Sequence, residues 1–176
     1  MNAKRLLKHI GLWGISSVAL ALAAPEAHAQ SAASNFTVSA AVARTCSIST
    51  VNMNFGNYDP ITTHATTPLD VNGSVTIACT RGTTTSIDLS PGSNAANAVG
   101  TTRAMATAGP DYLSYELYQD NTFSTVWGVG NPGNAYVPPV APSRAPRTFT
   151  IYGRIPAGQD RTVGNYSDTV TATVNF

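Results

Sequence analysis

Lysine is nearly missing from this chain: none follows Lys8, and the later cations are seven scattered arginines. Against them stand Glu116 and seven aspartates beyond residue 29, so the net charge of this part is close to zero. A surface that follows nucleic-acid phosphates needs clustered cations. We therefore expect no nucleic-acid partner.

Catalytic bases and metal ligands are equally scarce. His64 is the one histidine beyond residue 29, and a serine triad or a metal site would have to recruit it. It lies within "PITTHATTP", a threonine-rich stretch that is typical of an exposed turn. Glu116 and Asp120 are four residues apart, but on a strand followed by a turn this spacing does not bring a carboxylate pair together. The sequence therefore predicts neither an enzyme nor a bound metal.

One glycine motif has the letters of a dinucleotide-binding loop. "GVGNPG", at residues 128–133, matches G-x-G-x-x-G. Such a loop must open a helix whose N-terminus receives the pyrophosphate. Pro132 lies inside the motif and Pro138-Pro139 follow it, so no helix can begin there. We interpret the motif as a glycine turn and expect no cofactor.

Long apolar runs are confined to the N-terminus. Lys4, Arg5 and Lys8 precede an apolar stretch at 10–24, and Ala27-His28-Ala29 supplies small residues for cleavage. This pattern predicts a secretory signal peptide over residues 1–29, and hence export through the periplasm. The stretch is short for a membrane span.

Two cysteines, Cys46 and Cys79, are present. An even pair in an exported protein predicts one disulfide, and a metal site is the weaker alternative.

Alternating apolar and polar residues, bounded by turn residues, predict an all-β protein with no helix beyond the leader. The predicted strands cover residues 36–48, 52–58, 74–79, 85–89, 113–119, 125–127, 148–155 and 167–176. Many short strands of this kind favour an immunoglobulin-like β-sandwich. Residues 91–110 and 128–146 are predicted long loops, either mobile or used for surface function or subunit contacts.

The last predicted strand lacks a following neighbour. Its apolar face consists of Val170, Ala172, Val174 and Phe176. A second alternating segment lies near the start of the exported part, with Phe36, Val38, Ala40 and Val42 on one face. A sandwich that is one strand short exposes apolar surface and unpaired backbone. Insertion of this second segment from another copy would link copies head to tail.

Several short motifs, in order along the chain, carry a family resemblance. They are Asn54-Phe55-Gly56 after Cys46, "VTIAC" ending at Cys79, "YELY" at 115–118, Trp127-Gly128, "YGRIP" at 152–156 and the final "GNYSDTVTATVNF". With them the chain resembles the spore coat protein U domain family, the fold of archaic chaperone–usher pilus subunits. The resemblance implies an incomplete immunoglobulin-like sandwich at 46–176 preceded by a donor-strand segment at 30–45.

The resemblance also implies roles for residues and partners. Phe36, Val38, Ala40 and Val42 would be the donor side chains, and Val170, Ala172, Val174 and Phe176 would line the acceptor groove that a chaperone grips. Cys46 and Cys79 would pin the first strand to the sheet. The implied partners are other pilus subunits or further copies, a periplasmic chaperone and an outer-membrane usher. Cell-surface localisation, adhesion and biofilm formation follow as the family's role.

Two other functions stay open. If residues 36–42 fold into the chain's own sheet, the protein is a non-polymerising secreted or coat protein of the same family. If the loops near Trp127 and Tyr136 bind carbohydrate, it is an adhesin.

Overall fold

The computed structural model describes residues 28–109 and 111–176. The chain divides into two compact units, of which the first ends at Ala40 and the second, the body, is Ala41–Phe176. All but the last two residues of the predicted signal peptide lie outside the described residues. No helix in the described ranges is both long and apolar enough to cross a membrane.

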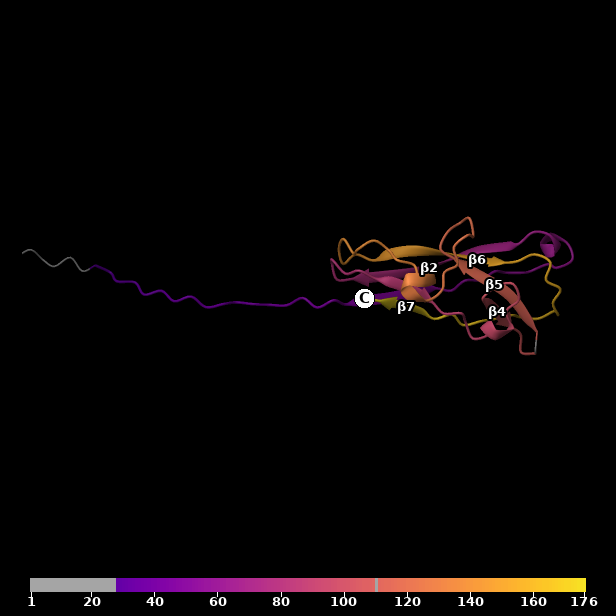
Figure 1. Cartoon of the computed structure of the whole chain (residues 1–176), viewed down its shortest axis with the longest axis horizontal. Coiled ribbons are helices and arrows are strands. Elements are labelled where there is room, and N and C mark those ends of the chain that lie inside the picture. Colours follow the sequence, from indigo (N-terminus) through magenta and orange to yellow (C-terminus); the bar gives the residue numbers. More distant parts are fainter. Residues whose placement is uncertain (1–27, 110) are drawn as a thin grey trace, which may run out of the picture. The chain divides into compact units, whose positions relative to one another are not determined.

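The body is built from seven strands (Figure 1). They are β1 (Cys46–Val51), β2 (Leu69–Cys79), β3 (Ser86–Leu89), β4 (Arg103–Ala106), β5 (Tyr112–Tyr118), β6 (Arg147–Ile155) and β7 (Ala172–Asn175). In the described residues, helical structure is limited to three short turns, η1 (Thr63–Ala65), η2 (Ala95–Asn97) and η3 (Gly130–Asn134).

The strands form two antiparallel sheets. The larger has the order β1-β2-β6-β5-β4, and the smaller pairs β3 with β7. β2 and β6 form the longest ladder, from Leu69 opposite Ile155 to Ile77 opposite Arg147. The prediction of an all-β, incomplete immunoglobulin-like sandwich with one disulfide is confirmed.

Several predicted strand boundaries are wrong. β1 begins at Cys46 and not near Phe36, and β7 is shorter than the predicted strand at 167–176. Residues 52–58 are not a strand, although apolar side chains in this stretch pack against the core. The predicted strand at 125–127 is reduced to a single bridge between Tyr118 and Val126. The predicted loop at 91–110 contains β4.

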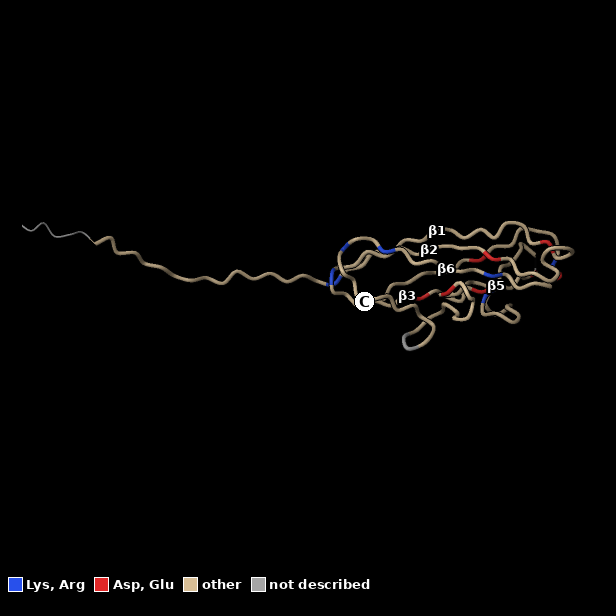
Figure 2. The backbone as a smooth tube through the Cα atoms, turned by 90° about the horizontal axis from the view of Figure 1, so that it is seen from above, with Lys and Arg blue, Asp and Glu red and all other residues tan. Residues whose placement is uncertain are grey.

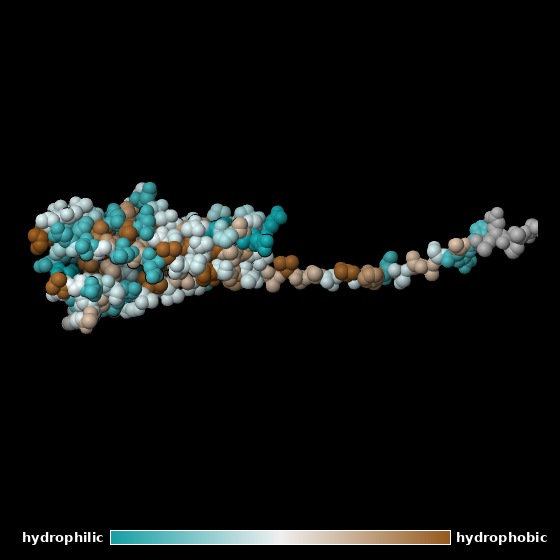
Figure 3. Space-filling view, turned by 180° about the vertical axis from the view of Figure 1, so that it is seen from behind, coloured by the Kyte–Doolittle hydropathy of each residue, from teal (hydrophilic) through white to brown (hydrophobic). Residues whose placement is uncertain are grey.

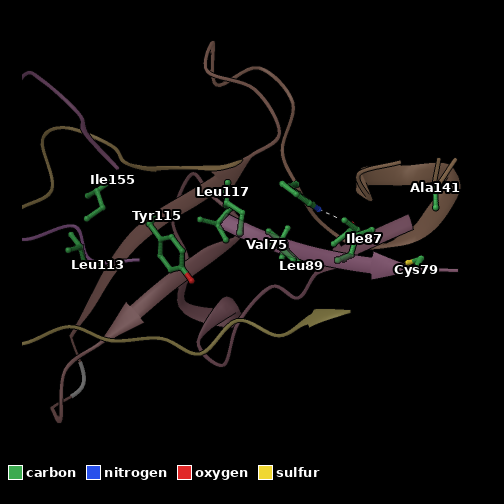
Figure 4. Packing of buried hydrophobic residues seen from close by; sticks show 12 residues of the cluster. Val75, Cys79, Ile87, Leu89, Leu113, Tyr115, Leu117, Ala141 and Ile155 are labelled. Carbon is green, nitrogen blue, oxygen red and sulfur yellow. Dashed lines mark hydrogen bonds between the residues drawn. The ribbon is translucent and has the colours of Figure 1, made fainter. Parts of the chain in front are cut away.

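The core lies between the two sheets (Figure 4). The larger sheet contributes Val75 and Ile77 from β2, and the smaller contributes Ile87 and Leu89 from β3; all four are nearly inaccessible to solvent. Alternate residues of each strand point inward, as a two-residue period requires. Trp127 is also fully buried, and its indole N–H donates a 2.8 Å hydrogen bond to the Ile87 carbonyl.

The predicted disulfide joins Cys46 and Cys79. These residues are directly opposite each other at one end of the β1–β2 ladder. The bond therefore ties the first residue of β1 to the last residue of β2.

Replacing both cysteines by alanine should lower the free energy of unfolding by about 3 to 4 kcal/mol, because the bond closes a loop of 33 residues in the unfolded chain. Urea unfolding of the exported form measures this change. A loss below about 1 kcal/mol would show that the disulfide does not restrict the unfolded chain as its loop length requires.

A buried ion pair within the larger sheet also binds the end of β3 in the smaller sheet. Arg103 of β4 and Glu116 of β5 are almost wholly buried and contact each other through Nη1 and Oε1. Glu116 Oε2 also accepts hydrogen bonds from the backbone N–H and the hydroxyl of Thr102, both at 2.7 Å. The remaining Arg103 donors bind backbone carbonyls, at Ser90 (3.0 Å), Leu89 (2.9 Å) and Trp127 (2.7 Å). The pair thereby fixes the end of β3 to the larger sheet.

The substitution Arg103→Met should lower the free energy of unfolding by about 3 to 5 kcal/mol, because it leaves Glu116 charged and buried. Adding Glu116→Leu should recover part of this loss. The matched control is Arg154→Met, which breaks a more exposed pair with Asp70 and should cost about 1 kcal/mol or less. Equal losses for the two arginine variants in urea unfolding would contradict the assigned role of Arg103.

Candidate functional site: the seam between β1 and β7

β1 and β7 are two of the four strands of the body that pair with one neighbour only; β3 and β4 are the others. β7 pairs with β3, from Ala172 opposite Leu89 to Asn175 opposite Ser86. β1 pairs with β2. No other strand of the described ranges pairs with either of them, and β1 and β7 lie close to each other. We call the line between these two edges the seam. Edges of this kind carry backbone groups that can pair with an added strand.

Apolar side chains lie along the seam. Val170, Ala172 and Val174 pack against the core but remain partly exposed, and so does Ile48 of β1. The intervening threonines at 169, 171 and 173 are exposed. The predicted alternation of this segment is therefore present. Phe176 follows the end of β7 and is 52% exposed.

The face of the body shown in Figure 3 is mostly polar. On the face shown in Figure 3, teal and white residues predominate in the body, and brown residues occur in separate spots. The seam differs because its apolar residues are consecutive members of one strand face.

The C-terminal segment is held in place before β7 begins. Asp168 accepts hydrogen bonds from the Tyr115 hydroxyl (2.8 Å) and the Ser93 backbone N–H (2.9 Å). Gly92 lets this carboxylate approach, since a Cβ at that position would lie 2.0 Å from Asp168 Oδ2. Burial, and then the hydrogen bond to Asp168, raises the pKa of the Tyr115 phenol well above its usual value.

A second anchor lies three residues further on. Thr171 donates its backbone N–H to the Ser90 hydroxyl, and its carbonyl accepts from the Ser90 N–H, both at 2.9 Å. Ser90 is also the residue whose carbonyl Arg103 binds. The position of β7 is thus fixed from the β3 side, and its other edge is left free.

The N-terminal segment has the complementary pattern. Residues 28–45 form no helix or strand. Phe36, Val38 and Val42 are 87%, 82% and 86% exposed, and Ala40 is exposed as well. The segment therefore presents apolar side chains at every second residue that no core covers.

Of the two predicted loop-binding residues, one is fully buried and the other partly buried. Trp127 has no exposed area. Tyr136 is half-buried, and its ring lies 5.0 Å from Trp127 and 5.2 Å from Phe149 between centroids. Both aromatic rings pack in the core, so the expectation that Trp127 contacts a carbohydrate is wrong: a surface ligand cannot reach it.

His64 is buried and not exposed as its turn predicted. Its ring stacks on Tyr58 with centroids 5.0 Å apart, and its Nδ1 lies 3.0 Å from the Thr67 carbonyl. Within residues 28–109 and 111–176, no group of three or more histidine, cysteine or acidic side chains could hold a metal ion. We therefore assign His64 a structural role.

Some residues that shape the site were not identified from the sequence. Arg103 and Glu116 fix the end of β3, and Asp168 holds the segment before β7. For Asp168, a carboxylate at the start of a strand is ordinarily explained by local backbone hydrogen bonds. Its position before an alternating strand is the single signal that could have suggested a wider role.

Comparisons with known proteins agree with this architecture. The family model of the Spore Coat Protein U domain matches residues 32–173. Protein U of Myxococcus xanthus is 34% identical over 172 residues, which cover 92% of this chain and 94% of Protein U.

One solved structure with a similar fold is a crystal structure of the CsuC–CsuE chaperone–tip adhesion subunit pre-assembly complex, from the archaic chaperone–usher Csu pili of Acinetobacter baumannii. The TM-score is 0.55 and the identity 24%, and the match covers 77% of this chain and 40% of that chain. At this identity the likeness bears on the fold alone. The family model spans most of the chain and Protein U matches nearly all of it, so this chain belongs to the Spore Coat Protein U domain family.

Proposed function

We propose that this protein is a structural subunit of a surface pilus, assembled by insertion of residues 30–45 of one copy into the seam of another. The observation that supports this most directly is the free edge of β7, with Val170, Ala172 and Val174 half-buried beside it. The same chain carries an exposed segment with the matching two-residue period. The fold likeness to a subunit crystallised with its chaperone favours the same function.

The energetics of such an insertion are favourable. Burying four apolar side chains gains on the order of 5–10 kcal/mol before costs, and a backbone ladder adds to this. Because the donor and the acceptor belong to the same sequence, each added copy brings a new donor and a new seam. A contact of this kind does not close on itself and produces a fibre.

A free seam is also an aggregation hazard before assembly. We therefore expect a periplasmic chaperone to cover it with a strand of its own, and an outer-membrane usher to exchange that strand for the donor segment of the next copy. The product would be an extracellular fibre that supports adhesion and biofilm formation.

Val38→Asp should reduce the fraction of copies that are linked at least about tenfold, because it places a charge in an apolar seam. Thr37→Asp is the matched control, since this residue lies on the opposite face of the same segment. Unboiled gel samples of surface extracts show the links as a ladder that collapses on heating. Persistence of the ladder in the Val38→Asp variant would contradict donor-strand linkage.

Val174→Asp should abolish both the ladder and co-purification with a tagged periplasmic chaperone, because both partners need the seam. Thr173→Asp, on the exposed face of β7, should leave both intact. Val38→Asp should keep the chaperone complex. If Val174→Asp and Thr173→Asp retained the chaperone equally, the seam would not be its binding site.

A second function is favoured by the match to Protein U along nearly the full length of both chains. In that case the protein is a coat or secreted protein that does not polymerise. The exported protein would then run as a single species in unboiled samples, and deletion of residues 30–42 would not change its size distribution.

A further inference from the structure

The arginines of the body fall into two groups. Three are paired with acids: Arg103 with Glu116, Arg154 with Asp70, and Arg161 with Asp111. The other four, Arg44, Arg81, Arg144 and Arg147, have no acidic partner in the described part of the chain. In a protein with so few charges, four unpaired cations are a large share of the total.

The four unpaired arginines gather at one end of the sandwich, which we call the basic pole (Figure 2). Thr45, Arg81 and Arg144 line the same shallow hollow. Hydrogen bonds join Thr45 to Thr80. Arg44 precedes Thr45 and Arg81 follows Thr80 in the sequence, so these two arginines lie in the same region. Arg147 begins β6 at this end and donates to the Pro139 carbonyl at 2.6 Å.

The opposite end carries Asp59, Asp111 and Asp160 against Arg161, and we call it the acidic pole. Hydrogen bonds link its loops: Gln159 N–H donates to the Tyr58 hydroxyl (3.1 Å), and Thr162 N–H donates to Asp111 (2.7 Å). Figure 2 shows acidic residues at this end of the tube.

Two of these carboxylates are fixed in their charged form. Hydrogen bonds from Thr62 and Ile61 lower the pKa of Asp59 to about 2. Hydrogen bonds from the backbone and hydroxyl of Thr162 and from Tyr166 hold the pKa of Asp111 well below its usual value.

The donor segment brings these two poles together, if the proposed function holds. β7 runs toward the basic pole: in Figure 1 its arrow leads to the C mark, which in Figure 2 lies at the end with the basic residues. A donor strand antiparallel to β7 therefore leaves the acceptor at its acidic pole. Only three residues separate Val42 from Cys46, where β1 of the donor copy begins, so the two Cα atoms are at most about 14 Å apart. The basic pole of the donor copy must then lie against the acidic pole of the acceptor copy.

We infer that the basic pole of one copy docks on the acidic pole of the next, and that this charge contact sets the angle and stiffness of the fibre. The occupant is a second copy of this chain, because charge complementarity and the short linker both select it. The inference rests on the proposed function. The inserted strand links the two copies, and the contact between the poles supplies the salt-dependent part of the fibre's stiffness. Salt weakens this contact because the Debye length falls from about 8 Å at 0.15 M to about 3 Å at 1 M salt.

Fibre stiffness as a function of salt tests the contact. Wild-type fibres should lose about twofold in persistence length, measured on electron micrographs, between about 20 mM and about 500 mM NaCl. Arg81→Gln with Arg144→Gln should be flexible at both salt concentrations. Ala96→Glu with Thr150→Glu gives the same change in net charge on exposed residues away from the poles, and should behave as wild type. All three forms should keep the heat-sensitive ladder.

A charge exchange sharpens the test. Arg81→Glu with Arg144→Glu should remove the stiffness, and adding Asp160→Arg with Thr63→Arg, at the acidic pole, should restore it. If the pole variants match wild type in stiffness and salt response while their ladders persist, this inference is wrong and the proposed function stands. If wild type itself gives no ladder, the proposed function fails and this inference falls with it.

Discussion

The organising constraint of this fold is that β7 is hydrogen-bonded on one side only. In a β-sandwich, both the backbone groups and the alternate side chains of a strand need neighbours. β7 satisfies its β3 side and leaves the β1 side open, with three apolar residues half-buried along it. A fourth apolar position, Phe176, lies beyond the strand and is largely exposed. The sandwich is therefore incomplete along this edge of β7.

An open edge is useful only if the strand beside it stays ordered, and the buried polar contacts explain how it does. Arg103 binds the last carbonyls of β3, and Ser90, the next residue, makes two hydrogen bonds with Thr171. Asp168 adds contacts to the preceding loop and to Tyr115. Because these bonds lie on the side away from the seam, an inserted strand would not need to displace them.

The sequence predicted those features that repeat along the chain or follow from a pair of residues. The alternation before Phe176 was sufficient to predict the seam-lining face, since a period-two pattern is typical of a strand. The two cysteines were sufficient to predict the disulfide, since a single cysteine pair in an exported chain is typical of one. β4 was not predicted because it lies in a stretch rich in glycine, alanine, asparagine and threonine. Only the folded structure shows that Arg103 is buried there beside Glu116. Trp127 and His64 were expected at the surface because they lie in glycine- or threonine-rich stretches. Their burial depends on side chains that are distant in sequence, such as Ile87 and Tyr58.

The distribution of charge follows from the same incomplete edge. A strand donated through a three-residue linker joins two bodies tightly but leaves rotation about the linker free, because the inserted side chains fix the donor strand and not the body behind it. Few charges are available to restrict that rotation, since charged residues make up 11% of the sequence. Scattered charges would be screened or paired locally. The cations lie at the basic pole, where the donor segment leaves its own body. The acids lie at the acidic pole, where that segment emerges from the acceptor. The unpaired charges are therefore placed where two linked bodies come within a Debye length of each other. Arginine suits such a contact better than lysine, because its planar guanidinium can bind a carboxylate with two parallel hydrogen bonds.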